Sequence, residues 1–72
     1  MSEAAKDVLL SLKKLHEDTG EVRFHDPEIT LVYGIKLPNN VIEELDNLGY
    51  IDYHDGVAPY LIFHPERVKN FS

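Results

Sequence analysis

The sequence predicts a small α+β domain, and three patterns along its 72 residues support that class. The first is an apolar stripe with helical spacing near the N-terminus. The second is a pair of shorter segments that carry helix start and stop signals. The third is two alternating segments separated by Asp55-Gly56, which is a hairpin signal. We expect one domain over residues 1–72, because so short a chain has no room for two hydrophobic cores.

The first element is predicted to be an amphipathic helix over residues 3–18. Its apolar stripe follows the spacing i, i+3, i+4, i+7 and consists of Ala5, Val8, Leu9, Leu12, Leu15 and His16. Ser2 is suited to cap the N-terminus, and Gly20 lies where the helix stops. A short alternating strand over residues 21–25 follows, with its apolar side chains facing inward.

Two interpretations compete for residues 27–34. A helix is favoured because Asp26 suits the N-cap, Pro27 the first helical position and Gly34 the stop. Its buried stripe would consist of Ile29, Val32 and Tyr33. The rival is a strand, because residues 29–33 are rich in strand-forming types.

After a turn at residues 35–38, another helix is predicted over residues 38–48. Its inner face would consist of Val41, Ile42, Leu45 and Leu48. Asn40 and Glu43 have the spacing of a capping box, and Gly49 ends the helix.

A β-hairpin is predicted next, with strands over residues 50–54 and 60–64 around the Asp-Gly turn. Pro59 cannot donate to a ladder, so it indicates an edge strand or a bulge. Pro65 ends the second strand, and residues 66–72 are expected to form a short tail.

This order of elements resembles the winged helix-turn-helix family. Residues 28–35 are similar to the second helix of that family and its following turn, and residues 41–51 to the end of its recognition helix. The run from Leu45 to Ile51 is similar to the family's LxxLGYI type, so residues 52–63 would be the wing. The resemblance covers residues 3–65. It implies a small winged-helix-like domain with the order helix, short strand, helix, helix and β-hairpin wing. Members of the family bind DNA through the third helix, or bind proteins instead.

The net charge of -6 belongs to one contiguous segment, residues 37–66. That segment has no basic residue, and its acidic residues are Glu43, Glu44, Asp46, Asp52, Asp55 and Glu66. Acidic and basic residues balance in the rest of the chain. A DNA-binding protein gains affinity by neutralising phosphates, and it reads bases mainly with Arg, Lys, Asn and Gln. DNA binding by the third helix is therefore disfavoured.

We expect the outward side chains of this segment to bind a basic protein partner or a second copy of the chain. The expected contact residues are Asn39, Asn40, Glu43, Glu44, Asp46, Asn47, Asp52, His54 and Asp55. The leading hypothesis is thus a non-catalytic protein-interaction or regulatory module with an acidic helix-plus-hairpin surface. One form of it is imitation of nucleic acid, in which the chain occupies a partner's DNA- or RNA-binding groove. The alternative is a DNA-binding transcription regulator of the winged helix-turn-helix type.

No catalytic, cofactor or metal site is predicted, and no small-molecule substrate is inferred. The chain has no cysteine, which excludes thiolate catalysis and cysteine zinc sites. The adjacent pair Glu43-Glu44 has no nucleophile nearby in the sequence and is expected to be a solvated face. An enzyme would need a cleft that gathers two or more histidines with a carboxylate.

Four histidines are expected at the surface or its boundary, because none has metal-ligand spacing, although a metal site stays open. They are His16, His25, His54 and His64. Protonation of all four near pH 6 would move the net charge from -6 towards -2, which predicts pH-sensitive solubility or binding.

Four aromatic residues of the hairpin are expected either in the core or at an interface. They are Tyr50, Tyr53, Tyr60 and Phe63. Strand alternation puts Ile51 and Tyr53 on one face and Tyr50 and Asp52 on the other. At least one tyrosine should therefore be exposed beside Asp52 and His54.

No apolar run approaches the ~18 residues of a membrane-spanning helix. The N-terminus also lacks the charged-then-apolar pattern of a signal peptide, so a cytoplasmic protein is expected.

Overall fold

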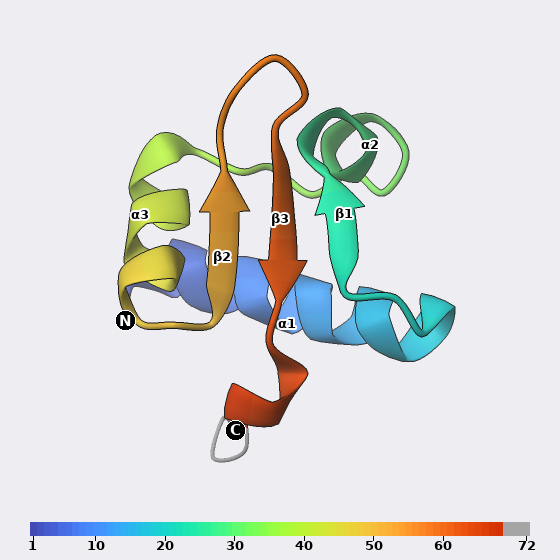
Figure 1. Ribbon diagram of the computed structural model, residues 1–72. Helices are drawn as coiled ribbons and strands as arrows, with labels where there is room; N and C mark the ends of the chain where they lie inside the picture. Colours follow the sequence, from blue (N-terminus) through green and yellow to red (C-terminus); the bar gives the residue numbers. More distant parts are fainter. Residues whose placement is uncertain (69–72) are drawn as a thin grey trace.

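Within residues 1–68, which the structure describes, the computed structural model contains three α-helices, a three-stranded antiparallel sheet and a 3-10 turn (Figure 1). In chain order the elements are α1 (Glu3–Thr19), β1 (Arg23–His25), α2 (Asp26–Leu31), α3 (Asn39–Asn47), β2 (Ile51–His54), β3 (Tyr60–Phe63) and η1 (Pro65–Arg67). The predicted α+β class is confirmed, and the arrangement is compatible with a small winged-helix-like fold. None of the helices in this part of the chain is long and apolar enough to cross a membrane.

α1 forms where the apolar stripe predicted a helix. The Ser2 hydroxyl accepts a hydrogen bond from the backbone N–H of Ala5 at 3.1 Å, which satisfies one free donor of the first turn. Gly20 ends the helix in the left-handed conformation, with a φ of 74° that would strain a residue with a Cβ. The buried side chains are those of the predicted stripe except His16, which is half-buried; they are Ala5, Val8, Leu9, Leu12 and Leu15.

β3 is the central strand of the sheet, because the strand order is β1-β3-β2 and both pairings are antiparallel. Leu61 of β3 is paired with Phe24 of β1 on one side and with Tyr53 of β2 on the other. These positions point towards the helices, and Phe24 and Leu61 are buried. All three predicted strands are confirmed, with shorter ends.

The predicted hairpin is confirmed, but its connection spans residues 55–59 instead of a tight Asp-Gly turn. That tight turn needs a positive φ at both central residues, and within residues 1–68 only glycines have one. The expectation for Pro59 is wrong, because Pro59 precedes the central strand and does not lie on an edge strand. Its carbonyl accepts a hydrogen bond from the N–H of Asp26 at 3.0 Å, which ties the loop to α2.

α2 is a helix, so the strand interpretation of residues 27–34 is wrong. The expected N-cap is also wrong, because Asp26 is the first helical residue and His25 occupies the N-cap position. The carboxylate of Asp26 is engaged elsewhere, since it accepts a hydrogen bond from the hydroxyl of Tyr53. Proline near the start of the helix is confirmed.

Only part of the buried stripe expected for α2 is present. Ile29 is buried, but Val32 and Tyr33 are 69% and 42% exposed, so the prediction is wrong for these two residues. The helix ends at Leu31 with Val32 as its C-cap, and Gly34, with a φ of 69°, then turns the chain. Residues 31–33 therefore form an exposed apolar segment, in which Leu31 is 83% exposed.

α3 buries most of its predicted inner face, which consists of Val41, Ile42 and Leu45. The prediction is wrong for Leu48, which is 52% exposed because the helix has ended and the chain turns at Gly49. The capping box of Asn40 and Glu43 is also wrong. Pro38 occupies the N-cap position without a side-chain hydrogen bond, and Asn40 already lies inside the helix.

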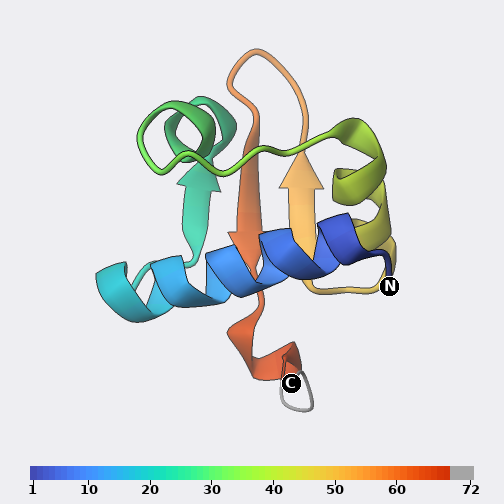
Figure 2. The same ribbon diagram turned by 180° about the vertical axis from the view of Figure 1, so that it is seen from behind.

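The helices lie on one face of the sheet (Figure 1). α1 crosses behind the strands, α2 lies beside β1 and α3 lies beside β2; Figure 2 shows residues 32–38 crossing the same face. α2 and α3 are therefore at opposite edges of the sheet. No described helix covers the other face, which is in front in Figure 1. We call it the open face; its strand residues are Arg23, His25, Asp52, His54, Tyr60 and Ile62.

Pro65 ends the second hairpin strand, as predicted, and the chain then folds back. Val68 is only 6% exposed and packs into the core. Arg67 Nη1 donates a hydrogen bond to the carbonyl of Gly49 at 2.7 Å, which ties η1 to the turn before β2. The segment expected as a tail, residues 66–72, thus begins with an ordered turn, and residues 69–72 lie outside the described residues.

Candidate functional site

The residues expected to form an interaction surface come from α3 and the β2–β3 hairpin. We call this set the acidic surface: Asn39, Asn40, Glu43, Glu44, Asp46, Asn47, Asp52, His54 and Asp55. Those up to residue 47 lie on α3, and the others lie on β2 and the loop after it. Because α3 packs beside β2 (Figure 1), the two parts adjoin. Strand alternation, however, turns Asp52 and His54 towards the open face, so the acidic surface extends around an edge of the molecule.

Glu44 is the one α3 member of the acidic surface that is half-buried, because it contacts the N-terminal end of α1. Its Oε2 accepts the backbone N–H of Ser2 at 2.6 Å, and its Oε1 accepts the Ser2 hydroxyl at 2.7 Å. These bonds favour the charged carboxylate and lower the pKa of Glu44 below its usual value. Neighbouring Glu43 is exposed and makes no hydrogen bond or ion pair with the described residues, so its charge faces solvent.

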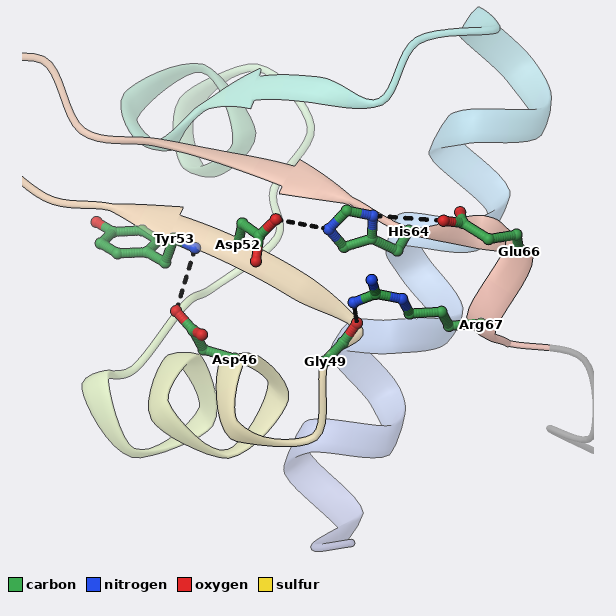
Figure 3. Close-up of polar contacts among 7 residues, drawn as sticks. All are labelled: Asp46, Gly49, Asp52, Tyr53, His64, Glu66 and Arg67. Atoms are coloured by element: carbon green, nitrogen blue, oxygen red, sulfur yellow. Dashed lines mark hydrogen bonds and ion pairs between the residues drawn. The ribbon is translucent and has the colours of Figure 1, made fainter.

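Asp46 joins the end of α3 to the outer edge of the sheet. Its Oδ2 accepts a hydrogen bond from the backbone N–H of Tyr53 at 3.2 Å (Figure 3). β2 is an edge strand, so this N–H has no partner inside the sheet. Asp46 supplies that partner and leaves the edge less free to pair with a strand from another chain.

Asp52 forms a cluster with the start of η1. The ring of His64 lies between two carboxylates, with Nε2 at 2.7 Å from Oδ2 of Asp52 and Nδ1 at 3.5 Å from Oε2 of Glu66 (Figure 3). The hydrogen bond with His64 lowers the pKa of Asp52 below its usual value. Asp52 therefore stays ionised while it holds the chain that leaves β3.

His54 is packed against an aromatic ring on the open face. It stacks on Tyr60 with ring centroids 4.6 Å apart and an interplanar angle of 14°. The guanidinium carbon of Arg23 lies 4.2 Å from the centroid of the same ring, and His25 meets it edge-on at 6.4 Å. Arg23 and Tyr60 were not among the expected contact residues. The β2–β3 hairpin, which the sequence predicts, places Tyr60 opposite His54. The pairing of β1 with β3 adds Arg23, and the sequence has no signal for that pairing.

The hairpin tyrosines divide between the core and the open face. Tyr50 and Tyr53 are half-buried and pack against the core. The tyrosine that shares a face with Asp52 and His54 is Tyr60, which is also half-buried. A tyrosine therefore lies beside these two residues, but the antiparallel register makes it Tyr60 and not Tyr50. The expectation that it is exposed is wrong, because Tyr60 is half-buried.

Tyr53 also carries a strongly perturbed phenol. Its hydroxyl donates a hydrogen bond to Oδ2 of Asp26 at 2.6 Å. Burial, together with this hydrogen bond and the negative charge of Asp26, raises the pKa of Tyr53 to about 12. The contact links β2 to the first turn of α2 across the sheet, so its role is structural.

Three of the four histidines share the open face or its end, namely His25, His54 and His64. His16 lies on α1, where Nδ1 is 2.8 Å from the carbonyl oxygen of Glu21 and the ring meets Phe63 edge-on. Among residues 1–68, no group of three or more His, Asp or Glu side chains is arranged to hold a metal ion.

The basic side chains lie mainly on other parts of the molecule. Those with described positions on α1, on β1 and between α2 and α3 are Lys6, Lys13, Lys14, Arg23 and Lys36. Arg23 adjoins the acidic surface, because it packs over the ring on which His54 stacks. Arg67 does so too, because its bond to Gly49 brings a positive charge close to the end of α3 (Figure 3). The acidic surface is therefore bordered by one arginine on the η1 side.

Two shallow hollows lie between α1 and the segment before α3, with volumes of about 230 and 290 Å³. Ser11 and Ile35 line both of them, and the exposed Tyr33 borders the smaller one. The described residues around them include no histidine, so neither hollow gathers the groups that a histidine-based catalytic cleft would need.

Comparisons of the chain with protein-family models, with curated proteins and with solved structures find no match. Its function is therefore inferred from the surfaces described above.

Proposed function

We propose that this chain is a non-catalytic protein-interaction module that presents the acidic surface to a basic partner. The observation that carries the proposal is the position of α3 beside β2, which gathers the carboxylates of a base-free sequence segment on adjoining faces. Complementary charge steers association and selects against partners of the wrong sign.

Fixed carboxylates support this proposal. Glu44, Asp46 and Asp52 each accept hydrogen bonds from another element, so their side chains are held in place before a partner arrives. A partner then loses less entropy in ordering them. The lowered pKa values of Glu44 and Asp52 also keep these two groups charged in mildly acidic solution.

Apolar contact area is available at both ends of the acidic surface. Leu48, just after α3, is 52% exposed, and Val57, in the loop between β2 and β3, is fully exposed. Interfaces combine an apolar centre with a polar rim, so these side chains suit a protein partner. Imitation of nucleic acid is a specific form of the proposal, in which the partner's basic groove normally binds DNA or RNA.

The alternative is a winged helix-turn-helix DNA-binding module. It is favoured by the element order and by the sheet order β1-β3-β2, in which the third helix leads into a hairpin. Two observations count against it. α3 carries carboxylates and no basic residue, and α2 lies at the opposite edge of the sheet from α3 (Figures 1 and 2).

The two functions are separated by fluorescence anisotropy with two labelled probes, an oligo-arginine peptide and a mixed-sequence DNA duplex, at low salt. The interaction module should bind the peptide and not the duplex. Peptide binding should disappear near 1 M salt, where the screening length is about 3 Å. Binding of the duplex, with no binding of the peptide, would favour the alternative.

Glu43→Lys tests the surface itself, because Glu43 has no internal hydrogen bond to lose. We expect it to weaken peptide binding by about threefold to tenfold, as for charges at the rim of an interface. Glu17→Lys is the matched control, since it makes the same charge change at an exposed position of α1. Equal losses for both variants would show that only the net charge matters and would contradict this contact surface.

A further inference from the structure

The open face has a charge pattern that complements itself. One cross-strand row consists of Arg23 on β1, Ile62 on β3 and Asp52 on β2, in register. The row thus reads positive, apolar, negative across the sheet. The next row consists of His25, Tyr60 and His54, with the tyrosine again on the central strand.

The two charged residues of the first row, Arg23 and Asp52, can each form an ion pair with a partner. Arg23 is exposed and makes no ion pair with the described residues, although it packs over the ring of Tyr60. Asp52 has a 54% exposed side chain and uses Oδ2 for His64, which leaves Oδ1 available. Ile62 and Tyr60 are half-buried and provide an apolar strip between the two edges.

We propose that two copies of this chain pack together through their open faces, about a two-fold axis parallel to the strands. Such an axis places β1 of one copy over β2 of the other. Arg23 of each copy then lies opposite Asp52 of the other copy, and Ile62 lies against its own equivalent. The contact between Arg23 and Asp52 therefore occurs twice, and the contact between the two Ile62 side chains lies on the axis, as a symmetric interface requires.

Charge complementarity is the reason to choose a second copy as the occupant. A uniformly acidic partner would face Asp52, and a uniformly basic partner would face Arg23, so each would meet one like charge. A second copy related by this axis opposes unlike charges at both edges. The apolar strip on β3 also meets an apolar strip, as sheets that stack face to face require.

The size of the face predicts a weak dimer. Stable interfaces bury about 800 Å² on each partner. The open face has three strands of three or four residues each, so it offers less area than that. We therefore expect reversible association in the micromolar to millimolar range, measured by sedimentation velocity of the full chain over a concentration series.

Paired charge reversals test the geometry. Arg23→Asp places two carboxylates at each edge contact, and Asp52→Arg places two guanidinium groups there, so each variant alone should dimerise at least about tenfold more weakly. An equimolar mixture of the two should form a heterodimer, because both edge contacts again oppose unlike charges. Circular dichroism of each variant checks that it is folded. A mixture of two folded variants that stays monomeric would overturn the proposal.

Ile62→Glu gives a second test that replaces no residue of the His64 cluster. It brings the carboxylates of the two copies together at the two-fold axis, so association should be abolished. Leu31→Glu is the control, because it introduces the same charge at an exposed apolar residue away from the open face. Wild-type protein that is monomeric at about 1 mM, or association lost only in Leu31→Glu, would contradict the proposal. Ile62→Glu adds a carboxylate beside Asp52 and should not weaken binding of the oligo-arginine peptide, so failure here is distinct from failure of the acidic surface.

Discussion

Asp26 and Tyr53 illustrate how single side chains acquire partners that the sequence does not indicate. Asp26 has the position and the neighbouring proline of an N-cap, yet its carboxylate accepts a hydrogen bond from the Tyr53 hydroxyl of strand β2. Asp46 and Asp52, which are expected from the sequence to contact a partner, also bond to other elements of the chain. Each of these contacts joins residues from different elements, so none can be inferred from local sequence pattern.

Tyr53→Phe should lower the free energy of unfolding by about 1 kcal/mol, because it removes one hydrogen bond. Urea unfolding at pH 7 measures this loss. In the folded wild type the raised pKa keeps the phenol protonated, so its contribution is present below about pH 10 and is lost as pH rises towards 12. The stability difference between wild type and Tyr53→Phe should therefore shrink in that window. If the stability difference between the two proteins does not change up to pH 12, the raised pKa of Tyr53 is contradicted.

At the level of elements, the sequence predicts the positions of the helices better than the residues at which they end. α1 was predicted nearly in full, because a long stripe, a serine cap and a terminal glycine all agree. α2 and α3 are short; the sequence predicts two buried residues past the actual end of α2 and one past the actual end of α3. Val32 and Leu48 are the C-cap residues at which these helices end, Tyr33 lies beyond the end of α2, and all three are exposed. Their apolar character alone could not show where the helices end.

The turn between α3 and β2 predicts a specific effect for Gly49→Ala. Gly49 has a φ of 83°, and an added Cβ would lie 3.3 Å from Arg67 Nη1. Backbone strain costs about 1 kcal/mol, and displacement of Arg67 from the Gly49 carbonyl costs about 1 kcal/mol more. Gly20→Ala is the matched control, because its φ of 74° is similar and nothing lies within 4 Å.

Urea unfolding followed by circular dichroism should show Gly49→Ala to be less stable than Gly20→Ala. Combining Gly49→Ala with Arg67→Ala should then cost less than the sum of the two separate changes. Strict additivity would show that the Arg67 contact has no part in the effect.

At the scale of the whole molecule, the helices cover one face of the sheet and the acidic surface continues round to the other. The N-terminus is tied to α3 through Ser2 and Glu44, and η1 is tied to the sheet through His64 and Asp52. Both chain segments are thus held by carboxylates whose pKa values are lowered in the fold. This arrangement makes global stability depend on pH.

For a carboxylate with a lowered pKa, the unfolded chain binds protons more readily than the folded one. The stabilisation is therefore present above the usual values, 4.5 for Glu44 and 3.8 for Asp52, and is lost as pH falls below them. Urea unfolding from pH 2 to 6 should show this decline. Ser2→Ala should reduce stability by about 1 kcal/mol at pH 6 through the lost cap, and should make the decline with pH shallower. An unchanged slope would contradict the role of the Ser2–Glu44 contact.

The α+β class, the positions of the helices and strands, and the concentration of negative charge in residues 37–66 all follow from the sequence. Helical and strand periodicity, caps, glycines and charge are properties of neighbouring residues, so they can be inferred before the chain is folded. The partners of the carboxylates, the central place of β3 and the open face depend on how distant segments pack. The contacts of Ser2 with Glu44, and of Arg23 with Tyr60, exist only after the sheet and helices assemble, because the energy of each contact depends on distances that local sequence does not set.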